Sequence, residues 1–203
     1  ILVLLFIVGQ TAFAQIKGLL FEISGNNLQK PSYIFGTMHL LCKGDFEMSE
    51  GMISKITSSE ILAMEMDLDD PTMGFKMLGK MKMKGDTSLS DLMPPTKYDS
   101  LRSYLKDSLN LPSMMFQKTK PFLIYSLILT KLLPCETLML ENEIMKIGKG
   151  KKVVGLETLD FQMGLMDKMS YQLQADYLLE TLADKAKSIR EFNEMAEAYK
   201  KRD

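Results

Sequence analysis

Short apolar runs alternate along the chain with longer segments of helical periodicity. Four runs have the composition of β-strands: 19–23, 32–35, 61–66 and 153–156. The first two flank Gly25-Asn26-Asn27, whose residues tolerate positive φ, so we expect these runs to pair as a hairpin. The third run is mostly apolar, which is typical of a buried strand.

The segments between and after these runs have the spacing of helices. Ser49 can cap a helix that extends to about Ser58, and Pro71 stands where a first-turn proline belongs for a helix toward Met83. Further apolar-periodic segments cover 96–109, 121–133, 138–148 and, as the longest, 170–199. Strands followed by helices predict one α/β domain, with a small central sheet and a helix-rich surround.

The first fourteen residues have the pattern of an export signal. Ile1 to Val8 is an unbroken apolar run, and Ala12-Phe13-Ala14 is the small-x-small sequence that signal peptidase reads. A transmembrane anchor or a core helix is the alternative, but the run is shorter than the roughly 20 residues that cross a bilayer. We expect residues 1–14 to be a signal peptide on a sequence truncated at its N-terminus, and residues 15–203 to be the domain. The protein is then exported, to the periplasm or outside the cell, and meets a membrane only through an uncleaved signal.

Composition removes several classes of function. The 25 Lys and Arg against 26 Asp and Glu leave a formal charge of -1, so the broad positive field of a nucleic-acid binder is missing. One His and two Cys cannot build a zinc finger or a four-thiolate cluster. The 18 Met could bind Cu(I), although Met more often fills irregular helix cores. The lysines of 76–84 could contact an anionic membrane, although a solvated lysine face is the simpler interpretation.

Candidate chemistry gathers around the only histidine. Run 32–35 leads into Gly36, where the backbone can turn or approach a ligand closely, and His39 follows three residues later. Glu65 lies in the third apolar run, where a strand would bury it, and a buried carboxylate is usually paired, metal-bound or protonated. Glu157 stands just after the fourth run. If they converge at strand ends, these three side chains supply a metal site or a general acid/base set.

Each of these residues also has an ordinary structural explanation. A lone histidine is more often structural than catalytic. Glu65 could point from an edge strand to solvent, and Glu157 could be an acidic residue placed favourably at a helix N-terminus. Spacing along the sequence does not decide between the two readings.

Four short elements follow one another along the mature chain. They are Tyr33-Ile34-Phe35-Gly36-Thr37-Met38-His39, Ala63-Met64-Glu65-Met66-Asp67, Lys120-Pro121 before a helix, and Gly155-Leu156-Glu157-Thr158 with Gln162 shortly after. In this order they resemble the TraB/GumN family, over nearly the whole mature chain. The resemblance implies an α/β core related to that of the ChaN-like and erythromycin-esterase proteins. It also implies an activity, because the family's animal members, the TIKI proteins, are metal-dependent proteases that act on signalling proteins.

The resemblance assigns a role to each candidate residue. His39 matches the histidine of the first Gly-x-x-His element, Glu65 the acidic residue on the following strand, and Glu157 the later Gly-Leu-Glu-Thr position. The family has a second Gly-x-x-His element near its C-terminus, which a sequence with a single His lacks. We therefore expect the domain and its site to be incomplete at the C-terminus.

Two classes of function remain. A metal-dependent hydrolase, most simply a peptidase, would use His39, Glu65 and Glu157 to hold a divalent metal ion that activates water and polarises a carbonyl. A non-catalytic exported protein would use the same cleft to bind a peptide or a small molecule. In either class the partner is a peptide or a small molecule and not a nucleic acid.

The two cysteines, Cys42 and Cys135, are expected to form a disulfide because export places an even pair of thiols in an oxidising compartment. The bond would close a long loop and tether the segment that follows His39. Two unpaired buried thiols are the alternative.

Overall fold

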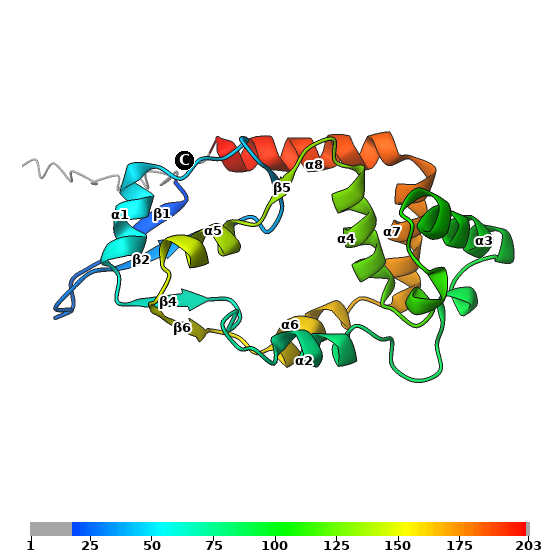
Figure 1. Ribbon diagram of the computed structural model, residues 1–203, viewed down its shortest axis with the longest axis horizontal. Helices are drawn as coiled ribbons and strands as arrows, with labels where there is room; N and C mark the ends of the chain where they lie inside the picture. The colour runs from blue at the N-terminus through cyan, green and yellow to red at the C-terminus, as the bar shows by residue number, and fades with distance from the viewer. Residues whose placement is uncertain (1–17, 202–203) are drawn as a thin grey trace, which may run out of the picture.

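Short strands and longer helices alternate in the structure, a computed structural model that describes residues 18–201 (Figure 1). The strands are β1 (Leu20–Ile23), β2 (Ser32–Phe35), β3 (Leu41–Cys42), β4 (Ile61–Met64), β5 (Thr137–Leu138) and β6 (Lys152–Gly155). The α-helices are α1 (Glu50–Ser58), α2 (Met73–Lys80), α3 (Pro95–Ser103), α4 (Pro121–Leu132), α5 (Leu140–Ile147), α6 (Leu159–Met166), α7 (Tyr171–Ala183) and α8 (Lys185–Lys200). Short 3-10 or π turns lie at η1 (Leu89–Asp91), η2 (Tyr104–Ser108) and η3 (Ser113–Phe116). The α/β class is confirmed, and the predicted signal peptide, 1–14, lies outside the described residues.

Within the described residues the strands form three separate two-stranded pairs, and not the one central sheet that the sequence predicts. β1 and β2 form the expected antiparallel hairpin, with φ of +91°, +46° and +63° at Gly25, Asn26 and Asn27. β4 and β6 are parallel, and β3 and β5, which the sequence analysis missed, pair antiparallel. Two-residue strands such as β3 and β5 carry too little periodicity to be recognised in a sequence.

Helix α2 is shorter at both ends than the predicted helix from Pro71 toward Met83. It begins at Met73, because the side chain of Asp70 accepts a hydrogen bond from the Thr72 backbone N–H at 2.7 Å and forms a turn there. It ends at Lys80, because the following residues pair with another segment: the Met83 N–H donates to the Lys118 carbonyl at 2.8 Å. Pro71 therefore precedes the helix instead of occupying its first turn.

Side-chain caps start four of the described helices, α1, α6, α7 and α8. Ser49 caps α1 as expected, and its Oγ accepts from the Met52 N–H at 3.3 Å. The prediction of one helix over 170–199 is wrong, because the chain breaks at Asp184, where φ is -135° and ψ is 77°. The Asp184 carboxylate accepts from the Lys187 N–H at 2.9 Å and so starts a new helix, α8.

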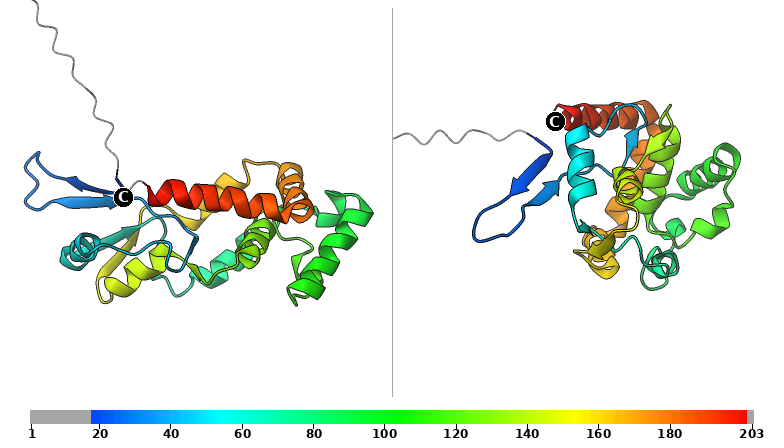
Figure 2. Two further views of the ribbon diagram at one scale, coloured as in Figure 1. Left: turned by 90° about the horizontal axis from the view of Figure 1, so that it is seen from above. Right: turned by 60° about the vertical axis from the view of Figure 1, so that its left-hand side comes forward.

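Three apolar cores stabilise the described fold, one in a helical region and two in a region that holds the strands. The helical region, which we define as α3, α4 and α7 with η1 and η2, encloses the larger core, and its fully buried side chains include Leu101, Leu105, Ile124, Ile128 and Leu178. The strand region, which we define as the three strand pairs with α1, α5 and α6, has smaller cores around Leu41, Met52, Leu140 and Leu62. Helix α8 contacts α4 and α7 and also buries Phe192 and Ala196 in the strand region, so it spans both (Figures 1 and 2). The β1–β2 hairpin projects from the rest of the chain (Figure 2).

Candidate functional site

His39 lies in the loop that joins β2 to β3. The loop starts at Gly36, whose N–H donates to the Leu19 carbonyl at 2.8 Å and whose carbonyl accepts from the Tyr199 hydroxyl at 2.7 Å. A methyl group added at Gly36 would meet only the Leu19 oxygen, at 3.9 Å. Nothing in the described fold therefore requires glycine at position 36, and its predicted role in admitting a ligand stays a prediction.

The buried acid of the site is Glu141, which the sequence analysis did not single out. It lies in the first turn of α5, and its side chain is only 8% exposed. Its Oε1 accepts from the Thr37 hydroxyl and from His39 Nδ1, each at 2.7 Å. Its Oε2 is buried without a hydrogen-bond partner. The carboxylate is thus shared between the His39 loop and α5, with one oxygen still able to accept.

Charge and hydrogen bonding shift both pKa values of this pair. Burial alone would raise the pKa of Glu141, but hydrogen bonds from His39 and Thr37 outweigh it and hold the pKa at about 2. The hydrogen bond to Glu141 raises the pKa of His39 above 6.5, against the opposing effect of burial. Because an ionised carboxylate only accepts, the ring proton of the neutral imidazole sits on Nδ1, and Nε2 presents a lone pair.

The free nitrogen of His39 faces Glu65. Nε2 is 3.6 Å from Glu65 Oε2, and the two side chains are 65% and 54% exposed. The expectation that a strand buries Glu65 is wrong: β4 ends at Met64, so Glu65 stands just past the strand and reaches solvent. The buried carboxylate beside His39 is that of Glu141 and not that of Glu65.

Glu157 is linked to Glu65 by a backbone hydrogen bond and by the side-chain amide of Gln162. Beyond the β4–β6 pair, the Glu157 N–H donates to the Glu65 carbonyl at 2.8 Å, which sets the two residues side by side at the carboxyl ends of parallel strands. Gln162, on α6, donates from Nε2 to Glu65 Oε2 at 3.4 Å and also to Glu157 Oε2. Gln162 belongs to the elements that carry the family resemblance, but only the structure shows that it links the two acids.

Gly155 is required for this arrangement. A Cβ at Gly155 would meet the Asp67 backbone nitrogen at 2.6 Å and the Met66 carbonyl carbon at 3.1 Å. The chain that leaves β4 therefore crosses the end of β6 at a distance that only glycine allows. This close crossing keeps Glu65 beside Glu157.

The three predicted site residues lie in one neighbourhood, but they do not form one cluster. Two meet directly, His39 and Glu65, and Glu157 joins through Gln162. Among the residues that the structure describes, no three His, Cys, Asp or Glu side chains are arranged to hold a metal ion.

An open groove of about 580 Å³ continues from Glu157 along α2 and α6. Its lining carries charges of both signs, with four acidic and two basic residues: Asp67, Asp70, Glu157, Asp160, Lys76 and Lys80. Lys76 pairs with Asp70 and Lys80 with Asp160, each at 2.7 Å. The groove is wide enough for a short peptide or a small molecule, and Met73 and Leu159 add apolar surface to its charged lining.

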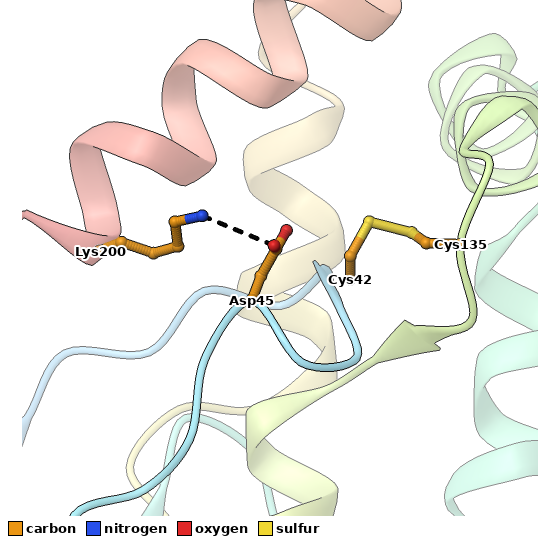
Figure 3. The surroundings of a disulfide bond; sticks show 4 residues. All are labelled: Cys42, Asp45, Cys135 and Lys200. Carbon is orange, nitrogen blue, oxygen red and sulfur yellow. Dashed lines mark hydrogen bonds and ion pairs between the residues drawn. A yellow bond between two sulfur atoms is a disulfide. The ribbon is translucent and has the colours of Figure 1, made fainter.

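The two cysteines, Cys42 and Cys135, form a disulfide (Figure 3). They stand three residues after His39 and six residues before Glu141 in the sequence. Within residues 18–201, no helix is long and apolar enough to span a membrane.

Fold and site together define a class: an α/β protein in which an exposed histidine, backed by a buried carboxylate, faces an acidic residue at the end of a parallel strand pair. The model of the TraB/PrgY/gumN family matches residues 19–203, and the chain belongs to this family. The resemblance to the TraB/GumN family is thereby confirmed. No curated protein and no solved structure matches the chain.

Proposed function

We propose that the protein is a hydrolase that cleaves an acyl bond in a peptide or a small molecule. The contact between His39 and Glu141 carries this proposal. A side chain that is 65% exposed is held by a carboxylate that is 8% exposed, so a buried charge orients a ring at the surface. This is how a protein positions an imidazole as a general base or as a metal ligand.

Glu141 prepares His39 for proton transfer. It keeps the ring proton on Nδ1 and leaves the Nε2 lone pair toward the site. In the reaction Nε2 takes a proton from water while the water oxygen adds to the substrate carbonyl carbon, and Glu141 stabilises the imidazolium that forms. The proton then moves from Nε2 to the leaving nitrogen or oxygen as the acyl bond breaks, which yields an acid and an amine or alcohol.

Glu65 and Glu157 place negative charge beside His39 Nε2, where the reaction would take place. Glu65 lies 3.6 Å from Nε2, and Gln162 holds both acids through a single amide. This negative charge favours the imidazolium and attracts a cationic group of the substrate. The neighbouring groove then takes the rest of the substrate chain.

A divalent metal ion, which the family resemblance implies, fits the described residues in part. Metal-bound histidines commonly donate the other ring N–H to a carboxylate, as His39 does to Glu141. His39 Nε2, Glu65 and Glu157 are the groups that would hold the ion, and a bound ion would lower the pKa of water and polarise a carbonyl.

Hydrolysis of peptide and ester libraries tests the proposal. His39→Ala should reduce kcat/KM by about 100-fold or more, as the loss of a general base or metal ligand does. Glu141→Gln should also lower activity, whereas its matched control Glu143→Gln, a change at a partly exposed acid of the same helix, should not. A chelator that abolishes activity, with recovery on adding a divalent metal, identifies the metal-dependent route. Activity that persists in chelator identifies His39 as the base.

A protein that hydrolyses nothing but still binds a peptide or small molecule contradicts the proposal. Binding that His39→Ala weakens without any turnover would instead identify a non-catalytic binding protein that uses the same site.

We also propose that the protein is exported after cleavage of residues 1–14. The apolar run and Ala12-Phe13-Ala14 support this, and a disulfide is typical of an oxidising compartment. Mass spectrometry of the full-length protein should find a mature N-terminus near Gln15 in the extracytoplasmic fraction. Cytosolic protein that retains the leader would contradict export.

A further inference from the structure

The His39 loop and the segment before Glu141 are joined by a very short ladder. β3 and β5 pair over two residues each, Leu41 opposite Leu138 and Cys42 opposite Thr137. One further backbone hydrogen bond, from the Lys43 N–H to the Glu136 carbonyl at 2.7 Å, extends the pair. Typical strands have about five or six residues, so this pair alone is a weak restraint.

The disulfide reinforces this ladder at its end. Cys42 follows His39 by three residues, and Cys135 precedes Glu141 by six, with a Cα–Cα distance of 5.6 Å. The bond therefore ties the two segments whose side chains make the His39–Glu141 contact. Both cysteines are only partly buried, so a small thiol reductant can reach the bond.

Other contacts also act on these segments. The Thr37 hydroxyl donates to Glu141 Oε1 at 2.7 Å and ties the start of the His39 loop to α5, but it does not orient the imidazole. The end of α8 holds the His39 loop, because Tyr199 donates to the Gly36 carbonyl at 2.7 Å and Lys200 lies 3.5 Å from Asp45 (Figure 3). Leu41 and Leu140 are buried in one core. These contacts survive reduction, so the fold should persist while the register of the His39 loop against α5 loosens.

We propose that the Cys42–Cys135 disulfide is a reducible clamp that sets the His39–Glu141 contact. A dithiol reductant transfers two electrons and two protons to the bond, which gives two cysteine thiols and a cyclic disulfide of the reductant. Oxidised protein holds the imidazole on Glu141, and reduced protein releases it. The inference concerns the geometry of the pair, so it applies to an enzyme and to a binding protein alike.

The single histidine makes the clamp measurable without any activity. Nitrogen NMR of the labelled imidazole, at a pH where the ring is neutral and with chelator present, gives the ratio of the Nδ1–H to the Nε2–H tautomer. The oxidised protein should favour Nδ1–H, since only this form donates to Glu141. Reduction should lower the ratio by about five- to tenfold, which corresponds to one lost hydrogen bond of ordinary strength.

Controls separate the clamp from a general loss of structure. The double variant Cys42→Ser/Cys135→Ser should show the reduced ratio with and without dithiol, and circular dichroism should be unchanged. If that variant does not fold, reduction of the folded wild-type protein, with two thiols titrated, gives the same comparison. An unchanged tautomer ratio in fully reduced protein overturns the proposal. Global unfolding on reduction also overturns it, because the bond would then hold the whole fold and not this contact.

Discussion

The helical region and the strand region are stabilised in different ways. Helices α3, α4 and α7 surround side chains such as Leu101, Ile124 and Leu178, which have no exposed surface. The strand region carries the candidate site on short strand pairs, and His39 and Glu65 are more than half exposed. Apolar burial therefore dominates in the helical region, whereas the strand region combines smaller apolar cores with hydrogen bonds, ion pairs and a disulfide. Stability and site geometry should respond to different substitutions.

The largest effect on stability is expected from Leu178→Ala in the helical region. Leu178 on α7 is 0% exposed, so truncation leaves a cavity and should lower the free energy of unfolding by about 2–5 kcal/mol. Leu173→Ala on the same helix is the control, because Leu173 is 44% exposed. Urea unfolding of both variants makes the measurement. Equal losses for the two leucines would show that this core does not dominate the stability of the chain.

The second effect tests the link between the two regions. Lys120 at the start of α4 is 3% exposed and lies 2.8 Å from Asp167, which caps the C-terminal end of α6. Lys120→Met should cost about 1–3 kcal/mol, because Asp167 loses its buried partner and keeps only its ion pair with Lys84 and a hydrogen bond from the Tyr171 hydroxyl at 3.3 Å. Lys118→Met is the control, since Lys118 is exposed and lies 3.5 Å from a fully exposed Asp86.

The pKa of Asp167 reports on the same link. Burial raises this pKa, but hydrogen bonds from Lys120 and Lys84 lower it below its ordinary value of 3.8. Carbon NMR of the Asp167 carboxyl should find a higher pKa in Lys120→Met than in the wild-type protein. A pKa that does not move, with stability unchanged, would show that α6 is held without this ion pair.

A smaller effect is expected at the boundary between α7 and α8. Asp184→Ala removes the side chain that accepts from the Lys187 N–H at 2.9 Å, and the loss of such a cap costs about 1 kcal/mol. Asp176→Ala, an exposed change within α7, is the control. If Asp184→Ala instead stabilises the protein, the two helices can merge into the single helix that the periodicity of 170–199 predicts.

The sequence predicts elements whose information is local. The β1–β2 hairpin follows from Gly25-Asn26-Asn27, and α1 follows from the Ser49 cap, because a turn residue and a cap act within a few positions. The α7–α8 break could not be predicted from apolar periodicity, which continues across it. The capping role of Asp184 depends on a backbone conformation that periodicity does not record.

The candidate site is less predictable because its decisive contact joins two residues that are 102 positions apart in the sequence. His39 was found because it is the only histidine, and Glu65 and Glu157 because they follow apolar runs. Glu141 lies within a helical segment next to the similar Glu143, and nothing local distinguishes the two. What separates them is burial: Glu141 is 8% exposed, and Glu143, paired with Lys146, is 34% exposed. That difference arises only when α5 packs beside the His39 loop.

The smallest effect on stability, and the sharpest test of the site, is the pH response of the His39–Glu141 pair. The pKa of Glu141 is lowered from 4.5 to about 2, so its contribution is present above 4.5 and is lost as the pH falls toward 2. The pKa of His39 is raised above 6.5, so its contribution is complete below 6.5 and is lost as the pH rises through the raised value. The pair should therefore stabilise the metal-free protein most between pH 4.5 and 6.5. The amount should be less than about 1 kcal/mol, because solvent screens the exposed ring.

Glu141→Gln isolates this contribution, because the amide keeps the shape of the side chain and removes its charge. In the metal-free protein, proton NMR of the single imidazole should find the His39 pKa lowered toward 6.5 in Glu141→Gln and unchanged in Glu143→Gln. The stability of Glu141→Gln should lose the maximum in that pH window, while the helical region, whose stability comes from apolar burial, should contribute equally in both proteins. A His39 pKa that is the same in wild type and in Glu141→Gln would show that the two side chains are not in contact in solution. The contrast between the two regions would then not extend to the candidate site, because no buried charge would hold the histidine of the strand region.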